Sequence, residues 1–339
     1  MTSRSIPPLL EPYLTTLTSP DAAGSLVLLT SVLGTSTNWL VLRHIQTLLR
    51  QTAASHPRRT AAAASGAGIG IGSGTQLGSG LDSGVGKGQQ GEEDSTEDAE
   101  TAVLLVSFLR DLTFWREGLA RLGVDLEAAA RRGRFAFVDG LCGGLFGGSS
   151  TASASPLQSQ AQGQPAWKRP LTSPAPGAIS SVVREAVEQL KGGDGGQSAG
   201  GGLSQNGTEK SSGRSKRVVL IMDGLDFVLA ASTGSSQSEA THTTILTLAS
   251  DSPLIHTQET PLEQQHAWFT LSLAHDADLL LSLRPLDTGA ARDVSGVIRI
   301  TTHPTTAAIK ATTAAHGGSH EWLYYVGGDG GVRVFERGQ

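Results

Sequence analysis

The chain has 339 residues, of which 5% are aromatic and 17% charged, and six carboxylates between Glu92 and Glu100 account for its formal net charge of −5. This balance argues against a strong affinity of the chain alone for nucleic acid, because such affinity needs a basic surface. Its one cysteine, Cys142, excludes an internal disulfide, and no apolar run reaches the length of a membrane span, so we expect a soluble intracellular protein.

The first predicted elements are a strand at residues 26–29, a turn at 30–37 and a helix at 38–49. The phosphate-binding pattern G-x-x-x-x-G-K-[ST] has this layout, with glycines that expose backbone N–H groups and a lysine that neutralises phosphate. Here Thr30 and Thr35 replace the glycines and Ser36 replaces the lysine, so that only Thr37 agrees with the pattern. We predict a degenerate loop that holds no cofactor, with Gly34, Ser36 and Thr37 as its candidate residues.

Two interpretations of this loop remain open. Its backbone N–H groups and the N-terminus of the following helix could still bind a phosphate without a lysine. Alternatively, it is a plain turn from strand to helix, with Ser36, Thr37 or Asn38 as the helix cap. The missing lysine favours the plain turn.

Strands and helices alternate along the rest of the chain. Apolar runs predict strands at residues 103–108, 135–138, 218–222 and 279–283. Helical spacing predicts one helix from an N-cap at Asp111 to Gly123, one across residues 179–190, and one from a capping box at Thr260 to about Ala274. Late antiparallel strands are expected at 297–301, 322–326 and 332–335. This order predicts an α/β fold with a mostly parallel sheet, helices on both faces and antiparallel edge strands.

Asp223 follows the apolar strand at residues 218–222, the position of a carboxylate that supports Mg²⁺ in many NTPases. Alternatively, Asp223 ends a buried strand and forms hydrogen bonds there, which the absence of an upstream lysine favours. Nine histidines show no metal-ligand spacing, and a single cysteine makes a zinc site a poor explanation. We therefore predict no catalytic residue and no metal site.

Glycine, serine, alanine and glutamine are concentrated in a few segments of the chain. Such segments lack the apolar area that offsets the entropy of ordering, so we predict disordered insertions at about residues 52–99, 147–176 and 193–215. The remaining residues, about 5–51, 100–146, 177–192, 216–232 and 240–337, are expected to form the ordered core of a single domain.

Arg131, Arg132 and Arg134 lie between a predicted helix and a predicted strand, which places them on a rim. A solvated charge cluster is the simplest interpretation. The alternative is a contact with another subunit or with a phosphate backbone.

One longer pattern is more specific than the loop. Residues 107–125 read S-F-x-R-x-x-x-F-W-x-x-G-x-x-x-x-G-x-D, joined by L-G-T-S-T-N-W at 33–39 and F-V-D-G-L at 137–141. On these residues the chain resembles the RecA-like proteins and, within them, the Elongator complex protein 6 family.

The resemblance implies a single RecA-like domain over residues 1–339 that has lost NTPase chemistry. It also implies two RecA-like sister subunits in a heterohexameric ring, which supports the catalytic Elongator subcomplex in modifying wobble uridines of tRNA. The tRNA would bind through the assembly, and the protein would be found in the cytoplasm and nucleus without contact to a membrane.

Two other functions remain open. One is an active RecA-like ATPase to which a neighbouring subunit supplies the missing cation. The other is a RecA paralogue of DNA recombination, which would need a basic surface that this near-neutral core does not offer.

Overall fold

The computed structural model describes residues 5–54, 100–141, 165–192, 216–227, 241–289, 291–303 and 305–338. In this part of the chain, ten strands form one sheet in the order β10-β9-β8-β7-β1-β6-β5-β2-β3-β4. The strands are β1 Ser25–Ser31, β2 Thr101–Ser107, β3 Phe135–Asp139, β4 Lys168–Pro170, β5 Arg217–Asp223, β6 Thr243–Ala249, β7 Leu279–Arg284, β8 Gly296–Thr302, β9 Ser319–Val326 and β10 Val332–Phe335.

The sheet is parallel from β7 through β4 and antiparallel from β7 to β10. The central strands are buried on both faces, and every residue of β2 is buried, which explains their unbroken apolar sequences. The predicted fold is thereby confirmed in its mostly parallel sheet and its antiparallel edge.

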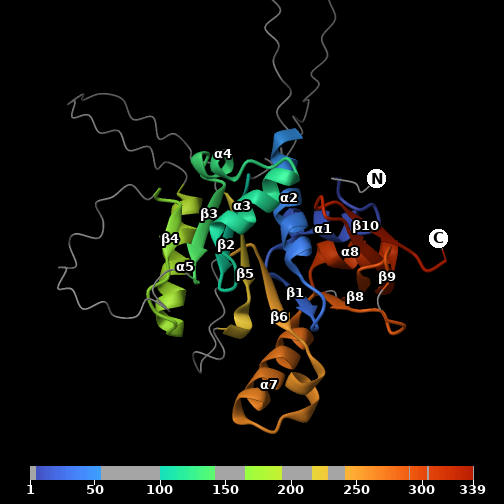
Figure 1. The fold of residues 1–339 in the computed structure, drawn as a ribbon. Helices are drawn as coiled ribbons and strands as arrows, with labels where there is room; N and C mark the ends of the chain where they lie inside the picture. The colour runs from blue at the N-terminus through green and yellow to red at the C-terminus, as the bar shows by residue number, and fades with distance from the viewer. Residues whose placement is uncertain are drawn as a thin grey trace, which may run out of the picture.

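Helices cover both faces of the sheet (Figure 1). They are α1 Glu11–Thr16, α2 Asn38–Ala54, α3 Leu112–Arg121, α4 Leu126–Arg131, α5 Pro176–Lys191, α7 Pro261–Asp276 and α8 Ala307–His316, with short helical turns η1 Pro20–Ala22 and η2 Pro253–Thr257. Side chains of α1 to α4 and α8 share one core cluster with one face of the strands, whereas α5 and α7 pack on the other face.

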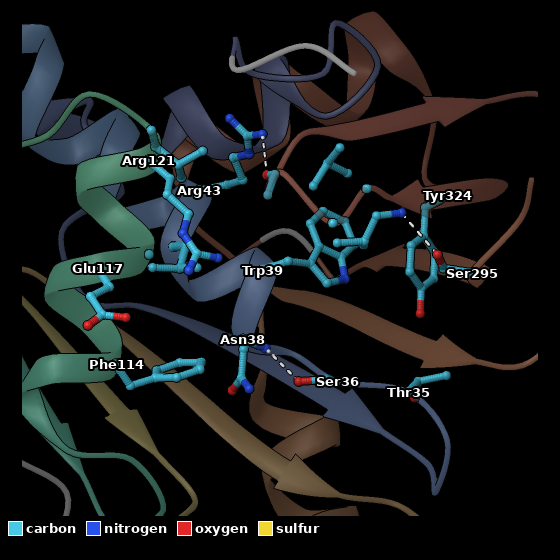
Figure 2. A pocket seen from close by; sticks show the side chains of 18 of the residues that line it. Thr35, Ser36, Asn38, Trp39, Arg43, Phe114, Glu117, Arg121, Ser295 and Tyr324 are labelled. Atoms are coloured by element: carbon cyan, nitrogen blue, oxygen red, sulfur yellow. Dashed lines mark hydrogen bonds between the residues drawn. The ribbon is translucent and has the colours of Figure 1, made fainter. Parts of the chain in front are cut away.

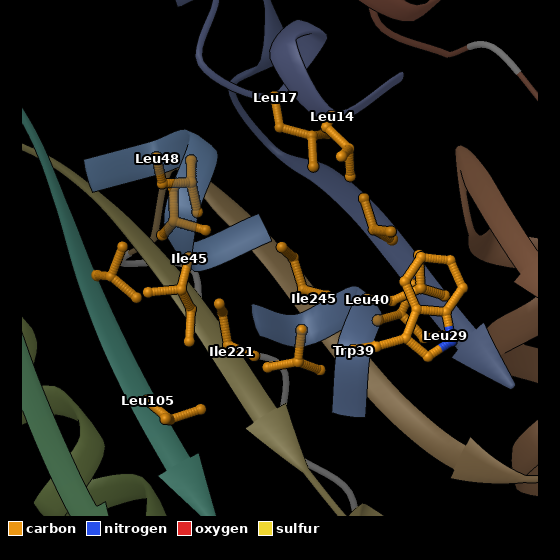
Figure 3. Packing of buried hydrophobic residues seen from close by; sticks show 14 of the residues in the cluster. Leu14, Leu17, Leu29, Trp39, Leu40, Ile45, Leu48, Leu105, Ile221 and Ile245 are labelled. Carbon is orange, nitrogen blue, oxygen red and sulfur yellow. The ribbon is translucent and has the colours of Figure 1, made fainter. Parts of the chain in front are cut away.

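Helix α2 occupies the centre of the first face. Figure 3 shows Leu40, Ile45 and Leu48 of this helix packed over Ile221 and Ile245 of the sheet. These five side chains are at most 1% exposed, so α2 is held on the sheet by apolar burial between Leu40 and Leu48. The loop that precedes α2 is therefore fixed at both ends, by β1 and by a buried helix.

Local capping signals set several helix boundaries as predicted. Asp111 caps α3 by accepting a hydrogen bond from the N–H of Phe114, at 3.0 Å. Thr260 and Glu263 form the predicted capping box of α7. These predictions succeed because each depends on residues three positions apart.

Some elements depart from the prediction. Residues 165–176 fall inside a predicted insertion, but the structure describes them. Lys168–Pro170 form β4, which pairs with β3, and Leu171 lies in the core. Helix α2 likewise runs to Ala54, beyond the expected start of the first insertion. The rest of the predicted insertions, at 55–99, 147–164 and 193–215, lies outside the described residues, as do the expected core residues 142–146, 228–232 and 240.

The sequence prediction also omits β6, α1, α4 and α8. Strand β6 is the most important of these, because it lies between β1 and β5 and pairs with both. Its sequence, T-T-I-L-T-L-A, is rich in threonine rather than uniformly apolar. Two of these threonines are buried because their hydroxyls donate hydrogen bonds, Thr243 to the carbonyl of Ala22 and Thr247 to Asp223.

Candidate functional site

The degenerate loop connects β1 to α2 at the carboxyl edge of the parallel strands. The N–H of Val32 donates to the carbonyl of Leu283 at 3.3 Å, and that of Thr35 donates to the carbonyl of Val32 at 3.0 Å. The Thr35 hydroxyl donates to the same two carbonyls, at 2.8 Å to Val32 and 3.3 Å to Leu283. The loop is thus folded onto itself and onto the end of β7.

An acidic side chain stands against the loop. Oδ1 of Asp251 accepts a hydrogen bond of 2.7 Å from the N–H of Leu33. The Leu33 side chain itself is 88% exposed. A carboxylate at this position both occupies a donor that could face a phosphate and repels the phosphate charge.

The start of α2 matches the plain-turn interpretation. The hydroxyl of Ser36 accepts a hydrogen bond of 3.2 Å from the N–H of Asn38, as Figure 2 shows. Thr37 is buried, and its carbonyl accepts the first helical bond from Val41 at 3.0 Å. Gly34 supplies the one left-handed residue of the turn, with φ of 90°.

Asp223 is 2% exposed at the end of β5 and lies among hydroxyl donors from the two neighbouring strands. Oδ2 accepts 2.9 Å from Ser107 of β2, and Oδ1 accepts 3.2 Å from Thr247 of β6. Burial raises the pKa of Asp223 above its ordinary value, and the two hydroxyls partly oppose that rise. This geometry agrees with the interpretation that Asp223 ties strand ends together.

A second, partly buried polar cluster, absent from the sequence prediction, fastens α7 to the sheet. Asp226 accepts hydrogen bonds from the N–H of Ala249 at 2.9 and 3.1 Å, and its Oδ1 lies 2.9 Å from Nε2 of His266. Forty positions separate Asp226 from His266, and neither belongs to a local motif. Only the fold brings these residues together.

A groove of about 500 Å³ opens beside the start of α2, between α3 and the β9–β10 hairpin. Figure 2 shows its labelled residues, which include Trp39, Phe114 and Tyr324 together with Arg43 and Arg121. Burial lowers the pKa of Arg43 to about 10, so the guanidinium stays protonated at neutral pH, and its NH2 donates to the carbonyl of Gly330 at 3.4 Å. The groove is aromatic and weakly cationic.

The three arginines singled out in the sequence do not share one environment. Arg131 and Arg132 are exposed at the end of α4, where Arg131 lies 3.9 Å from Glu127. Arg134 is 5% exposed and donates to the carbonyls of Thr101 and Leu48 at 3.2 and 3.3 Å. Its expected place on the rim is wrong, because its side chain joins α2 to the start of β2 within the core.

Within the described ranges, no group of three or more histidine, cysteine, aspartate or glutamate side chains is arranged to hold a metal ion. The helices of the same ranges include none that is long and apolar enough to cross a bilayer.

Comparison with known proteins gives one family match. The family model described as Elongation complex protein 6 matches residues 98–317. No curated protein matches the chain.

Two solved structures from Pyrococcus horikoshii are similar to the chain at low identity. One is an uncharacterized protein in complex with an unknown peptide, 12% identical, with 93% of each chain covered and a TM-score of 0.46. The other is a KaiC-like protein, 12% identical, with 92% of this chain and 90% of that chain covered and a TM-score of 0.42.

Proposed function

The chain belongs to the Elongation complex protein 6 family, and we propose that it is a non-catalytic RecA-like subunit of the Elongator complex. The observation that carries the non-catalytic part is the bond between Asp251 and the N–H of Leu33. It places a negative charge against the loop where an NTPase would hold phosphate. Family membership favours this function over that of a recombination paralogue.

Hydrolysis of ATP needs cations that offset the charge developing on the β- and γ-phosphates. Ser36 stands at the lysine position and instead accepts a hydrogen bond from Asn38. Asp223, the candidate metal ligand, is occupied by Ser107 and Thr247. If a neighbouring subunit completed an ATPase site here, that neighbour would have to supply a cation. It would also have to free the N–H of Leu33 from Asp251.

The family resemblance supports the finer part of the proposal. The chain assembles with two RecA-like sister subunits into a heterohexameric ring, and the ring serves the catalytic Elongator subcomplex during wobble-uridine modification. We propose that tRNA binds the assembled ring rather than the lone chain, which is near neutral apart from one acidic run. Several weak contacts on one ring raise the effective concentration of RNA without a strong single site. The protein then works in the cytoplasm and the nucleus.

Arg131 and Arg132 are the contact residues that we propose for a partner or for tRNA. Both are exposed at the end of α4, and Arg131 keeps only a long ion pair with Glu127 at 3.9 Å. Exposed pairs of this kind contribute little to stability, so the arginines are available at small cost.

The test is to purify the chain from its native cells under mild conditions and to identify stoichiometric partners. We expect two RecA-like Elongator subunits in equal amounts. Phosphate release from ATP by the pure chain should equal that of a Ser36→Ala control. Partners of DNA recombination, or turnover that depends on Ser36, would contradict the proposal.

A further inference from the structure

Helix α7 carries a row of four exposed residues on its outer surface, of which Trp268 and Leu271 are large and apolar. Gln264, Trp268, Leu271 and His275 follow one another at spacings of four, three and four residues, so they share one side of the helix. All four are exposed, with Trp268 at 68% and Leu271 at 53%. We call these four residues the outer stripe of α7.

The opposite side of α7 is already used by the core. Phe269, Leu273 and Ala274 pack against β1 and β6, and His266 is held by Asp226. The helix runs along this face of the sheet, from His266 near the carboxyl end of β5 to a C-terminus beside Leu26 at the start of β1, and it forms the lower tip of the molecule in Figure 1. Within the outer stripe, Gln264 donates a hydrogen bond of 3.1 Å to the carbonyl of Gln258, whereas Trp268 and Leu271 expose large apolar side chains at a cost in solubility.

Exposed apolar side chains are concentrated at the carboxyl edge of the parallel strands and on α7. Among the described residues the large exposed hydrophobic ones are Leu33, Leu109, Leu262, Trp268 and Leu271. Leu33 and Leu109 follow the carboxyl ends of β1 and β2, and the other three belong to α7. The edge where an NTPase would bind nucleotide thus exposes two leucines, and α7 beside it exposes three further apolar side chains.

The charges around α7 determine which partner fits the outer stripe. Residues 250–278 hold no lysine or arginine and five carboxylates, of which Asp278 is buried and Asp251 accepts a hydrogen bond from the N–H of Leu33. Glu259 and Asp276 are exposed near the two ends of the helix. Such a surface repels a phosphate backbone, although stacking on Trp268 would otherwise suit a nucleobase. A protein with an apolar pocket and a basic rim is complementary to it.

We infer that the outer stripe of α7 is a docking surface for a neighbouring protein subunit whose apolar pocket is bordered by lysine or arginine. This inference rests on the proposed function, which makes that neighbour one of the two RecA-like sister subunits. Trp268 is the central anchor, because large aromatic side chains supply much of the energy of protein interfaces. The exposed carboxylates near the two ends of the helix favour the basic rim over tRNA.

The experiment coexpresses the full chain with both sister subunits, captures the assembly through a tag on one sister, and measures how much chain is retained. Trp268→Ala should reduce retention on the order of tenfold or more, and Trp268→Asp with Leu271→Asp should abolish it. Leu262→Asp is the matched control, because Leu262 is a similarly exposed leucine of the same helix, 48% exposed but off the stripe. All variants should unfold at the wild-type temperature as lone chains.

The outcomes distinguish a failure of the docking surface from a failure of the proposed function. If wild-type and Leu262→Asp chains assemble and the stripe variants do not, the docking surface is supported. If the stripe variants assemble as well as wild type, the inference is wrong and the proposed function stands. A wild-type chain that captures neither sister overturns both. Loss of self-association or of tRNA binding by the lone Trp268→Ala chain would assign the stripe to a second copy or to RNA and overturn the inference.

Discussion

The hydroxyl of Ser107 donates a hydrogen bond of 2.9 Å to Oδ2 of Asp223, which joins the carboxyl ends of β2 and β5. In an NTPase a carboxylate at this position would support a metal ion. Here the hydroxyls of β2 and β6 surround it in a buried environment, and Ser107 also accepts from the N–H of Arg110 at 3.2 Å. Asp223 thus has a structural role.

Replacing Ser107 should therefore cost stability rather than activity. We expect Ser107→Ala to lower the free energy of unfolding by about 1–3 kcal/mol, because it leaves a buried carboxylate oxygen without its donor. Ser36→Ala, in the exposed degenerate loop, should cost well under ~1 kcal/mol. Urea denaturation of both variants measures the difference. Equal losses would contradict the structural role of the Ser107–Asp223 bond.

His44 should make the protein sensitive to acid. It is fully buried in α2, its ring nitrogens find no hydrogen-bond partner among the described residues, and burial lowers its pKa to about 3. The His44 ring takes up its proton near pH 6.5 in the unfolded chain, because its ordinary pKa applies there, but only near pH 3 in the folded chain. The contribution of the neutral ring is therefore complete above pH 6.5 and is lost as the pH falls toward 3.

The matching experiment compares His44→Leu with wild type at pH 7.5 and pH 5. When the pH falls from 7.5 to 5, wild type should lose roughly 2 kcal/mol more of its free energy of unfolding than the variant does, since each pKa unit is worth about 1.4 kcal/mol. His256→Gln, which changes an exposed histidine, should behave as wild type. An identical loss of stability in wild type and His44→Leu would show that the ring is not buried.

Arg134 and Arg132 should respond differently to the same substitution. Arg134→Met removes donors from the carbonyls of Thr101 and Leu48 and leaves Glu100, 3.2 Å from its Nε, unpaired. We expect a loss of about 3 kcal/mol, typical of breaking a buried network. Arg132→Met, at an exposed site, should change stability by less than ~0.5 kcal/mol. Chemical denaturation that gives the two variants equal stability would place Arg134 on the surface after all.

Gly224 and Gly34 both have positive φ, but they differ in the space available for a Cβ atom. Their φ angles are 74° and 90°, and a Cβ on Gly224 would lie 2.5 Å from Cγ of Leu109, whereas one on Gly34 meets nothing within 4 Å. Gly34→Ala should cost about 1–2 kcal/mol from the backbone alone. Gly224→Ala should cost about 1 kcal/mol more, because Leu109 must move. A smaller loss at Gly224, measured by thermal unfolding, would show that the contact does not restrict this site.

The sequence predicted the elements whose signals are local. The caps at Asp111 and Thr260 depend on bonds within one helical turn, and the apolar strands around residues 103–108 and 218–222 depend on burial of nearly every position. Strand β6 was not predicted from an apolar run, because three of its seven residues are threonine. Those hydroxyls become compatible with a central strand only when Ala22 and Asp223 are brought to them by the fold.

The candidate site shows the same division. The missing lysine at Ser36 can be read from the sequence, and so can the position of Asp223 after a strand. The acceptor for the N–H of Leu33 could not, because Asp251 lies 218 positions away. The burial of Arg134 was missed for a related reason, since two of its partners belong to α2 and β2.

The most direct test of the proposed assembly is native mass spectrometry of the full chain mixed with the two sister subunits proposed for it, without nucleotide. We expect a six-subunit particle that contains this chain, and we expect Ser36→Ala to leave its subunit composition unchanged. A chain that stays monomeric beside the proposed sister subunits, or that joins them only when ATP is bound at the loop after β1, would contradict the claim that this domain serves assembly without phosphate chemistry.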